Sequence, residues 1–450
     1  MVAFEKVAMG SGSRRNMRLY IDKGELGMMQ KQQKPIWIQN ISQLVTLASD
    51  KKGPRVREEM RELGIIEGGS VWIEDGVIQD LGTTRDMILK YLPRAEEAEI
   101  VDATGKIVTP GLIDPHTHVV FGGSREHEFE MRLEGASYMD IMNAGGGIHA
   151  TTRKMRSLTE EHIFNQTTRR LDLFLQHGVT TLESKSGYGL DVENELKQLR
   201  VMQRLQKKHP MDIVPTFMGA HAVPEEYRDN PEHYVDLVIN EMIPAVVQEN
   251  LAKFIDVFCE VDVFTPEQAQ RILLAGKAHG LIPKIHADEI AENQGAYVAA
   301  KVGAISAEHL LKVSDDGIEE LAKSGVMACL LPATALYLGE KPARARDIID
   351  AGVPVAISTD CNPGSSPTIS LPLVMNLACI TMKMTPAESL CAATYNAACA
   401  LQIEDRVGSI EVGKQADIVL WDVHNHQKLH YIFGVNHVKK VWKKGLRVVG

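Results

Sequence analysis

The stretch LDLFLQHGVTTL at residues 171–182 decides the fold class. Its apolar side chains follow helical spacing as far as His177, then Gly178 intervenes, and a short apolar run begins at Val179. Glycine suits the position just past a helix because it adopts the left-handed backbone conformation without steric penalty. The stretch therefore predicts an amphipathic helix, a tight turn and a buried strand.

The same unit recurs along the chain from about residue 109 onward, around Gly280, Gly325 and Gly352. Helices that alternate with strands imply a parallel sheet with crossover helices. Eight strands are expected, near residues 112–118, 179–184, 212–218, 254–259, 282–287, 304–308, 326–331 and 353–359. Eight such units over roughly 300 residues favour an α/β fold of the closed (β/α)8 TIM barrel type. An open, doubly wound sheet is the alternative.

The two ends of the chain follow another pattern. Residues 36–108 and 413–450 alternate apolar and polar side chains between glycine-rich turns, which is typical of short antiparallel strands. Neither segment has enough strand to form a sheet alone. We therefore expect one small β-sandwich domain built from both chain ends, beside a barrel over residues 109–412. Residues 1–35 have no clear periodicity and are expected to be a flexible N-terminal extension.

Composition restricts the possible partners and location. The formal net charge of -10 provides no basic surplus to neutralise nucleic-acid phosphates or an acidic membrane. No apolar stretch reaches the roughly 18 residues that a membrane helix needs. The six cysteines form no CxxC pair and lie in apolar segments, which indicates reduced thiols of a cytoplasmic protein. We expect a small-molecule substrate, no nucleic acid and no membrane.

The strongest local signal is VTPGLIDPHTH at residues 108–118. His116 and His118 are two residues apart, so both imidazoles project from one face of an extended strand and can share a metal ion. An isolated pair of this kind is often only an exposed strand face. Here His286, His309 and Asp360 close three further predicted strands. Parallel barrel strands end at one rim, so we expect all five side chains at the same mouth.

Imidazoles with one carboxylate suit zinc, and they also suit iron or another divalent ion. The metal would activate water and polarise a carbonyl group. The fourth predicted strand ends at Glu260 without a lysine that could be carbamylated to bridge two metals. One metal ion per chain is therefore expected, with zinc as the first choice and iron as the alternative.

Taken together, the VTPGLIDPHTH segment, the later histidines, the Ser358-Thr-Asp sequence and the tail GSIEVGKQADI at residues 408–418 resemble the amidohydrolase superfamily. The resemblance covers roughly residues 36–450. It implies a distorted barrel, a β-sandwich made from both ends, and a homodimer as one expected assembly. It also implies four metal ligands, namely His116, His118, His286 and Asp360.

Within that superfamily, six segments are similar to the imidazolonepropionase family. They are residues 120–126, 144–148, 185–190, 217–221, 284–289 and 359–367. The similarity implies hydrolysis of the ring amide of 4-imidazolone-5-propanoate to N-formimidoyl-L-glutamate, a step of L-histidine degradation. Cys361 departs from the pattern, because a bulky aromatic residue is expected there.

Such a substrate needs a cation for its propanoate tail, and Arg125 offers a bidentate fork. Hydroxyl donors for the same carboxylate are Tyr188 and, less strongly, Tyr138, because an aromatic residue on a helix more often packs. His221 is expected to hydrogen-bond the substrate carbonyl. A turn after Asp360 offers further donors for the tail, namely Asn362, Gly364 and Ser365.

Three side chains are candidates for catalysis. Glu289 could accept a ring N–H or carry a proton, and its alternative role is an acid at the start of a helix. His309 could polarise the carbonyl, and Asp360 could accept a proton from water while holding the metal. The sequence leaves open which of the three is the general base.

Two rival functions are considered. One is an amidohydrolase-type deaminase of a cyclic amidine or purine, but such a substrate has no carboxylate for Arg125 and Tyr188. The other is an inactive barrel with a structural role. An inactive chain should have lost metal ligands, whereas this chain keeps all of them.

Overall fold

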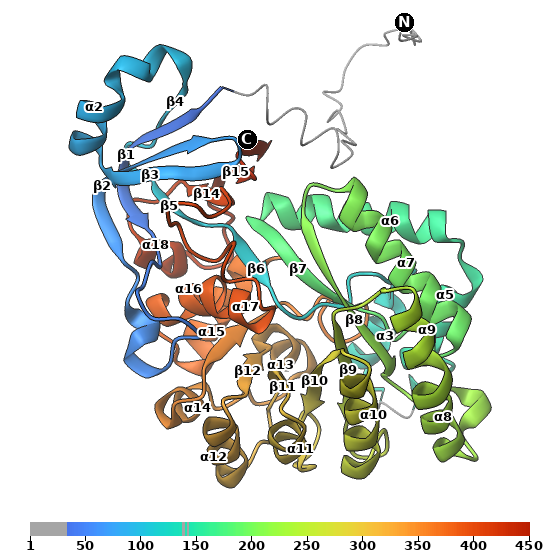
Figure 1. Cartoon of the computed structure of the whole chain (residues 1–450). Helices are drawn as coiled ribbons and strands as arrows, with labels where there is room; N and C mark the ends of the chain where they lie inside the picture. The colour runs from blue at the N-terminus through green and yellow to red at the C-terminus, as the bar shows by residue number, and fades with distance from the viewer. Residues whose placement is uncertain (1–33, 137–139, 142–143) are drawn as a thin grey trace, which may run out of the picture.

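The computed structural model describes residues 34–136, 140–141 and 144–450. Within these ranges the chain forms a parallel barrel and a separate mixed sheet (Figure 1). Residues 1–33, which make up most of the expected N-terminal extension, lie outside the described residues, as does Tyr138.

Eight parallel strands form the barrel and pair in sequence order. They are β6 (Leu112–Asp114), β7 (Val179–Lys185), β8 (Asp212–Ala220), β9 (Phe254–Cys259), β10 (Ile282–Ala287), β11 (Ser306–His309), β12 (Met327–Leu330) and β13 (Val355–Ile357). Two backbone hydrogen bonds join the segments that follow β6 and β13. The N–H of Asp360 donates to the carbonyl of His116 (3.1 Å), and the N–H of His118 donates to that of Cys361 (3.0 Å). The expected barrel is confirmed.

Helices cover the outside of the barrel (Figure 1). The longer ones are α5 (Gly147–Ser157), α6 (Glu160–Gln176), α7 (Val192–Lys208), α10 (Pro266–Ala278), α11 (Gly295–Val302), α12 (Asp315–Ser324) and α15 (Leu371–Met382). Shorter ones are α8 (Pro231–Leu237), α9 (Ile243–Gln248), α13 (Pro332–Leu338), α14 (Ala345–Ala351), α16 (Pro386–Ala392) and α17 (Tyr395–Ala400). As predicted, a left-handed glycine separates helix from strand, with φ of +84° at Gly178 and +93° at Gly352. This conformation is the one in which glycine avoids a side-chain clash.

Both chain ends contribute to one mixed sheet, as expected for the small β domain. Its strands are β1 (Ile36–Val45), β2 (Ile65–Glu74), β3 (Val77–Thr83), β4 (Glu99–Asp102), β5 (Ile107–Pro110), β14 (Ile418–Trp421), β15 (Val438–Lys443) and β16 (Leu446–Val449). Strand alternation gives it two apolar faces. Ile36 and Ile38 belong to one cluster, whereas Trp37 packs with Trp72 beneath α2 (Thr84–Tyr91). We propose 36–108, 109–412 and 413–450 as the division of the chain.

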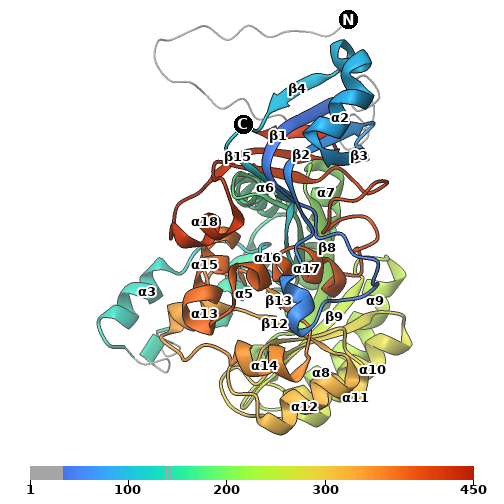
Figure 2. The ribbon, with the colours of Figure 1, turned by 90° about the vertical axis from the view of Figure 1, so that its left-hand side faces the viewer.

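A buried ion pair joins the mixed sheet to the barrel. Lys443 of β15 lies 2.7 Å from the carboxylate of Asp212, the first residue of β8, and also contacts Asp417. Two further helices are α3 (Glu126–Leu133), which projects to one side in Figure 2, and α18 (His426–Tyr431), which packs against α15 and α16. Among the described helices, none is long and apolar enough to cross a membrane.

Candidate active site

The two histidines after β6 are buried at the barrel mouth. The strand ends at Asp114, shorter than the sequence suggested, because Pro115 has no N–H to continue the ladder. The following segment is nevertheless held on both sides, by the hydrogen bonds to the segment that follows β13 and by one from Lys185 N–H to the Thr117 carbonyl (2.8 Å). His116 and His118 are therefore fixed in the core at 0% and 2% exposure.

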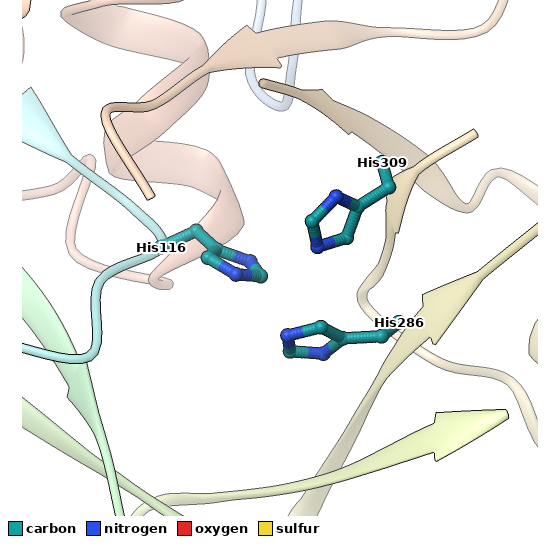
Figure 3. Close-up of side chains that lie close together, drawn as sticks. All are labelled: His116, His286 and His309. Carbon is teal, nitrogen blue, oxygen red and sulfur yellow. The ribbon is translucent and has the colours of Figure 1, made fainter. Parts of the chain in front are cut away.

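Three of the expected ligand nitrogens and one carboxylate oxygen converge. His286 Nε2 lies 3.4 Å from His118 Nε2, and Asp360 Oδ1 lies 3.4 Å from His116 Nε2 and 3.7 Å from His118 Nε2. A tetrahedral ion with bonds of about 2.0–2.1 Å places its ligands roughly 3.4 Å apart. Figure 3 shows that the rings of His116, His286 and His309 face a common space. His116, His118 and Asp360 thus form a group that could hold a metal ion, and His286 lies at ligand distance from His118.

The far nitrogens of two of these rings are held by carboxylates. His286 Nδ1 lies 3.0 Å from Asp256 Oδ1, and His116 Nδ1 contacts Glu308. A carboxylate accepts a hydrogen bond from the N–H at Nδ1, which keeps the proton on that nitrogen and leaves Nε2 free as a metal ligand. His116 Nε2 is buried and hydrogen-bonds no described residue, which agrees with a role as a ligand.

Asp360 has its two oxygens in different environments. Oδ2 accepts a hydrogen bond from Thr334 Oγ1 (2.7 Å), whereas Oδ1 faces the histidines. Burial raises the pKa of Asp360, but the close contact with His116 and the charge of that ring outweigh the effect of burial and lower the pKa to about 2. The backbone is left-handed at Asp360 (φ +52°) and at His309 (φ +73°), a conformation that is uncommon outside glycine. Such strain often accompanies functional strand ends.

Glu289 and His309 form a second pair beside the ligands. His309 Nδ1 lies 3.4 Å from Glu289 Oε1. Glu289 does not begin a helix, because α11 starts only at Gly295, so the helix-start alternative is wrong. Its backbone N–H donates to Glu260 (2.9 Å). Burial and the charges of Asp360 and Glu260 raise the pKa of Glu289 to about 8.

Arg125 lies against the turn that follows Asp360. A Cβ added at Gly364 would be 2.4 Å from Nη1 of Arg125, so any other residue here would displace the guanidinium. Within that turn, Asn362 Oδ1 accepts hydrogen bonds from the N–H groups of Gly364 and Ser365 (2.8 Å each). Among the described residues, Arg125 donates one hydrogen bond, from Nε to Thr151 (2.9 Å). Its two Nη groups can therefore receive an anion.

Tyr188 and His221 line the neighbouring side. The His221 ring is stacked on that of His118, with centroids 4.9 Å apart, and Tyr188 lies 5.4 Å from His221. His221 Nδ1 lies 3.0 Å from the Gly187 carbonyl, which can only accept, so Nδ1 carries the proton. Burial lowers the pKa of His221 to about 3. Neutral His221 therefore presents an acceptor, and the expected donation to a substrate carbonyl needs correction.

A buried ionic cluster beneath the ligands was missed by sequence reasoning. Its members are Glu183 and Lys185 of β7, Asp256 of β9, Lys284 of β10 and Glu308 of β11, all with fully buried side chains. In the sequence, a buried charged residue of a strand cannot be told apart from one that faces solvent until its partners on other strands are known. The available signal was the presence of Lys or Glu within otherwise apolar inner strands.

Comparison with known proteins assigns the chain to a family. A model of the amidohydrolase family matches residues 107–448. An imidazolonepropionase from Brevibacillus brevis is 61% identical, and one from a Geobacillus species 60% identical, each over 92% of this chain and 98% of the relative. A solved adenosine deaminase from Xanthomonas campestris with bound zinc gives a TM-score of 0.67 at 19% identity over 92% of each chain. That last similarity bears on the fold alone.

The barrel and its histidine cluster, with the family match, define a metal-dependent hydrolase of the amidohydrolase family. Within that family, the identity over nearly the whole length of the relatives makes the chain a member of the imidazolonepropionases.

Proposed function

We propose that this chain hydrolyses the ring amide of 4-imidazolone-5-propanoate to N-formimidoyl-L-glutamate during L-histidine breakdown. Membership of the imidazolonepropionases supports the reaction. The structural observation that carries the proposal is the position of Arg125 beside Gly364, four residues after Asp360. A guanidinium whose two Nη groups donate to no described residue, at the mouth of the metal cluster, suits a substrate that combines a ring amide with a carboxylate tail.

One metal ion per chain is proposed, with zinc as the first choice and iron as the alternative. The proposed ligands are His116, His118, His286 and Asp360. When bound, the ion would polarise the ring carbonyl and activate a water molecule. A further group that could hold a metal, Asp256 with His286 and Glu308, is already contacted by the ammonium of Lys185. That contact supports a single metal ion.

Glu289 is proposed as the residue that moves the proton. Asp360 already has a partner at each oxygen, because Oδ2 accepts from Thr334 and Oδ1 faces the histidines. Glu289 has a pKa near neutrality, where a group both accepts and donates protons effectively. It can take a proton from water and deliver it to the leaving ring nitrogen. His309, 3.4 Å away, steadies the carboxylate and faces the carbonyl.

The propanoate tail is proposed to bind Arg125, with Tyr188 as a hydroxyl donor. Burial raises the pKa of Tyr188, which therefore stays protonated. Asn362 and the N–H groups of Gly364 and Ser365 shape the turn beneath the tail. His221 is proposed to accept a ring N–H at Nε2. Tyr138 is kept as a further candidate donor.

The oligomeric state, cellular location and partners of the enzyme are also proposed. A homodimer is proposed on the family resemblance, and a cytoplasmic location is supported by six cysteines that form no disulfide. Neither nucleic acid nor membrane is proposed as a partner.

Anaerobic incubation with 4-imidazolone-5-propanoate tests the function. Loss of the ultraviolet absorbance of the imidazolone should depend on the enzyme, stop after treatment with a chelator, and return with added zinc or iron. A purine and a cyclic amidine, tested in parallel, should be unchanged. Turnover of those two compounds without turnover of the imidazolone would overturn the proposal.

A further inference from the structure

We infer that Lys185 is a positioning residue of the metal centre, because its ammonium group bridges the two carboxylates that orient His116 and His286. The inference rests on the proposed function in one respect, since it takes those two histidines as metal ligands. It concerns a residue that touches neither the substrate nor the metal.

Lys185 is the last residue of β7 and its side chain is fully buried. Its Nζ lies 2.7 Å from Glu183 Oε1, 2.7 Å from Asp256 Oδ2 and 2.9 Å from Glu308 Oε2. One ammonium group therefore contacts three carboxylates, which come from β7, β9 and β11.

Two of these carboxylates also contact histidines that are proposed metal ligands. Asp256 uses Oδ2 for Lys185 and Oδ1 for Nδ1 of His286, which is 3.0 Å away. Glu308 contacts Lys185 and Nδ1 of His116 through Oε2. Lys284 holds the other oxygen of Glu308 at 2.9 Å. Lys185 is thus one contact removed from two ligands that lie on opposite sides of the barrel mouth.

The arrangement has a direct physical consequence. The partner of the far nitrogen fixes both the tautomer and the ring angle of a metal-bound imidazole. Without an ammonium group between them, Asp256 and Glu308 would be like charges facing each other in a buried space of low dielectric constant. They would turn apart, and the Nδ1 atoms of His286 and His116 would lose the carboxylates that set the angles of the two rings.

A second buried lysine provides a control that distinguishes positioning of the ligands from a general contribution to stability. Lys443 is also fully buried and also contacts two carboxylates, Asp212 (2.7 Å) and Asp417. Its cluster lies between the mixed sheet and the first residue of β8, at the strand ends opposite the histidines. Replacing either lysine by methionine removes one buried cation of the same size, so Lys443→Met is a matched control.

The test compares Lys185→Met, Lys443→Met and the unmodified full-length enzyme. Each protein is stripped of metal and titrated with Co²⁺, and both the affinity and the visible absorption bands of the bound ion are recorded. Lys185→Met should bind Co²⁺ roughly 10- to 100-fold more weakly, the loss typical of partners that orient metal ligands, and its bands should shift. Lys443→Met should keep the affinity within about twofold and leave the bands unchanged, since its cluster lies at the strand ends opposite the ligand histidines.

Two results would overturn the inference. One is a Lys185→Met protein with unaltered Co²⁺ affinity and absorption bands. The other is an equal loss of Co²⁺ affinity in Lys443→Met, which would indicate that removing any buried lysine destabilises the whole protein. Failure of the unmodified protein to bind Co²⁺ would instead contradict the proposed metal centre, so the two failures are distinguishable.

A charge-balanced variant covers the case in which Lys185→Met does not fold. Lys185→Met combined with Glu183→Gln removes one positive and one negative charge, so the net charge of the cluster is unchanged. The bridge between Asp256 and Glu308 is still absent, and the same weakening and spectral shift are expected. Normal Co²⁺ binding by this double variant would likewise contradict the inference.

Discussion

His286 Nε2 lies 3.4 Å from His118 Nε2, the separation expected for two ligands of one tetrahedral ion. Replacing His286 by alanine should therefore lower the metal content of the purified protein well below one equivalent per chain, as measured by elemental analysis. His430→Ala is the control, because His430 is also buried but lies on α18. Two metal ions per unmodified chain would contradict the single-metal proposal.

Glu289→Gln and His309→Asn should keep the metal and lose most turnover. Neither side chain is a proposed ligand, and general acid–base groups typically contribute about 10²–10⁴-fold to the rate. Metal analysis and kcat should be measured on the same samples. If Glu289→Gln retained a nearly normal kcat, the proton would have to move through another group.

Gly364→Ala should weaken substrate binding with little effect on the thermal midpoint. The new methyl group would lie 2.4 Å from Arg125 Nη1, and the end of a flexible side chain can move aside at small cost. Hydrogen bonds to charged groups contribute about 1.5–3 kcal/mol, so kcat/KM should fall roughly 10- to 100-fold, mainly through KM. Gly82→Ala is the control, because the nearest atom to its new Cβ is 3.9 Å away. Equal KM values for both variants would exclude the contact.

Arg125→Met should raise KM far more than it lowers kcat, because the tail is remote from the bond that breaks. A shielded bidentate pair contributes on the order of 2–4 kcal/mol, so kcat/KM should fall roughly 30- to 1000-fold. An imidazolone without the carboxylate should be almost indifferent to the substitution. The two substrates and two enzymes form a double-mutant cycle, and a coupling energy near zero would mean that Arg125 does not bind the tail.

The sequence predicted the barrel and its histidine rim because the deciding signals are local. Glycines such as Gly178 separate helix from strand, and His286 and His309 fall at or next to the ends of apolar runs. The eight observed strands lie where the apolar runs predicted them, with ends that differ by a few residues in either direction. At β6 the difference of four residues has a local cause, because Pro115 cannot donate a ladder hydrogen bond.

The buried ionic cluster could not be predicted in this way. Lys185 and Glu308 are more than a hundred residues apart, and nothing in either local sequence shows that their side chains meet inside the barrel. The tautomer of His221 could not be predicted for the same reason, because it depends on a contact with the carbonyl of Gly187 in another turn. Contacts between distant segments become visible only when the strands are assembled.

The most direct test of the account is the identity of the product formed from 4-imidazolone-5-propanoate. Ring hydrolysis consumes one water and releases nothing, whereas deamination by the same kind of site releases ammonia. We predict that the metal-loaded enzyme converts the imidazolone to a single product one water heavier, N-formimidoyl-L-glutamate, with no ammonia in the coupled assay. An imidazolone that is unchanged after anaerobic incubation with metal-loaded enzyme, or ammonia released in proportion to its loss, would contradict it.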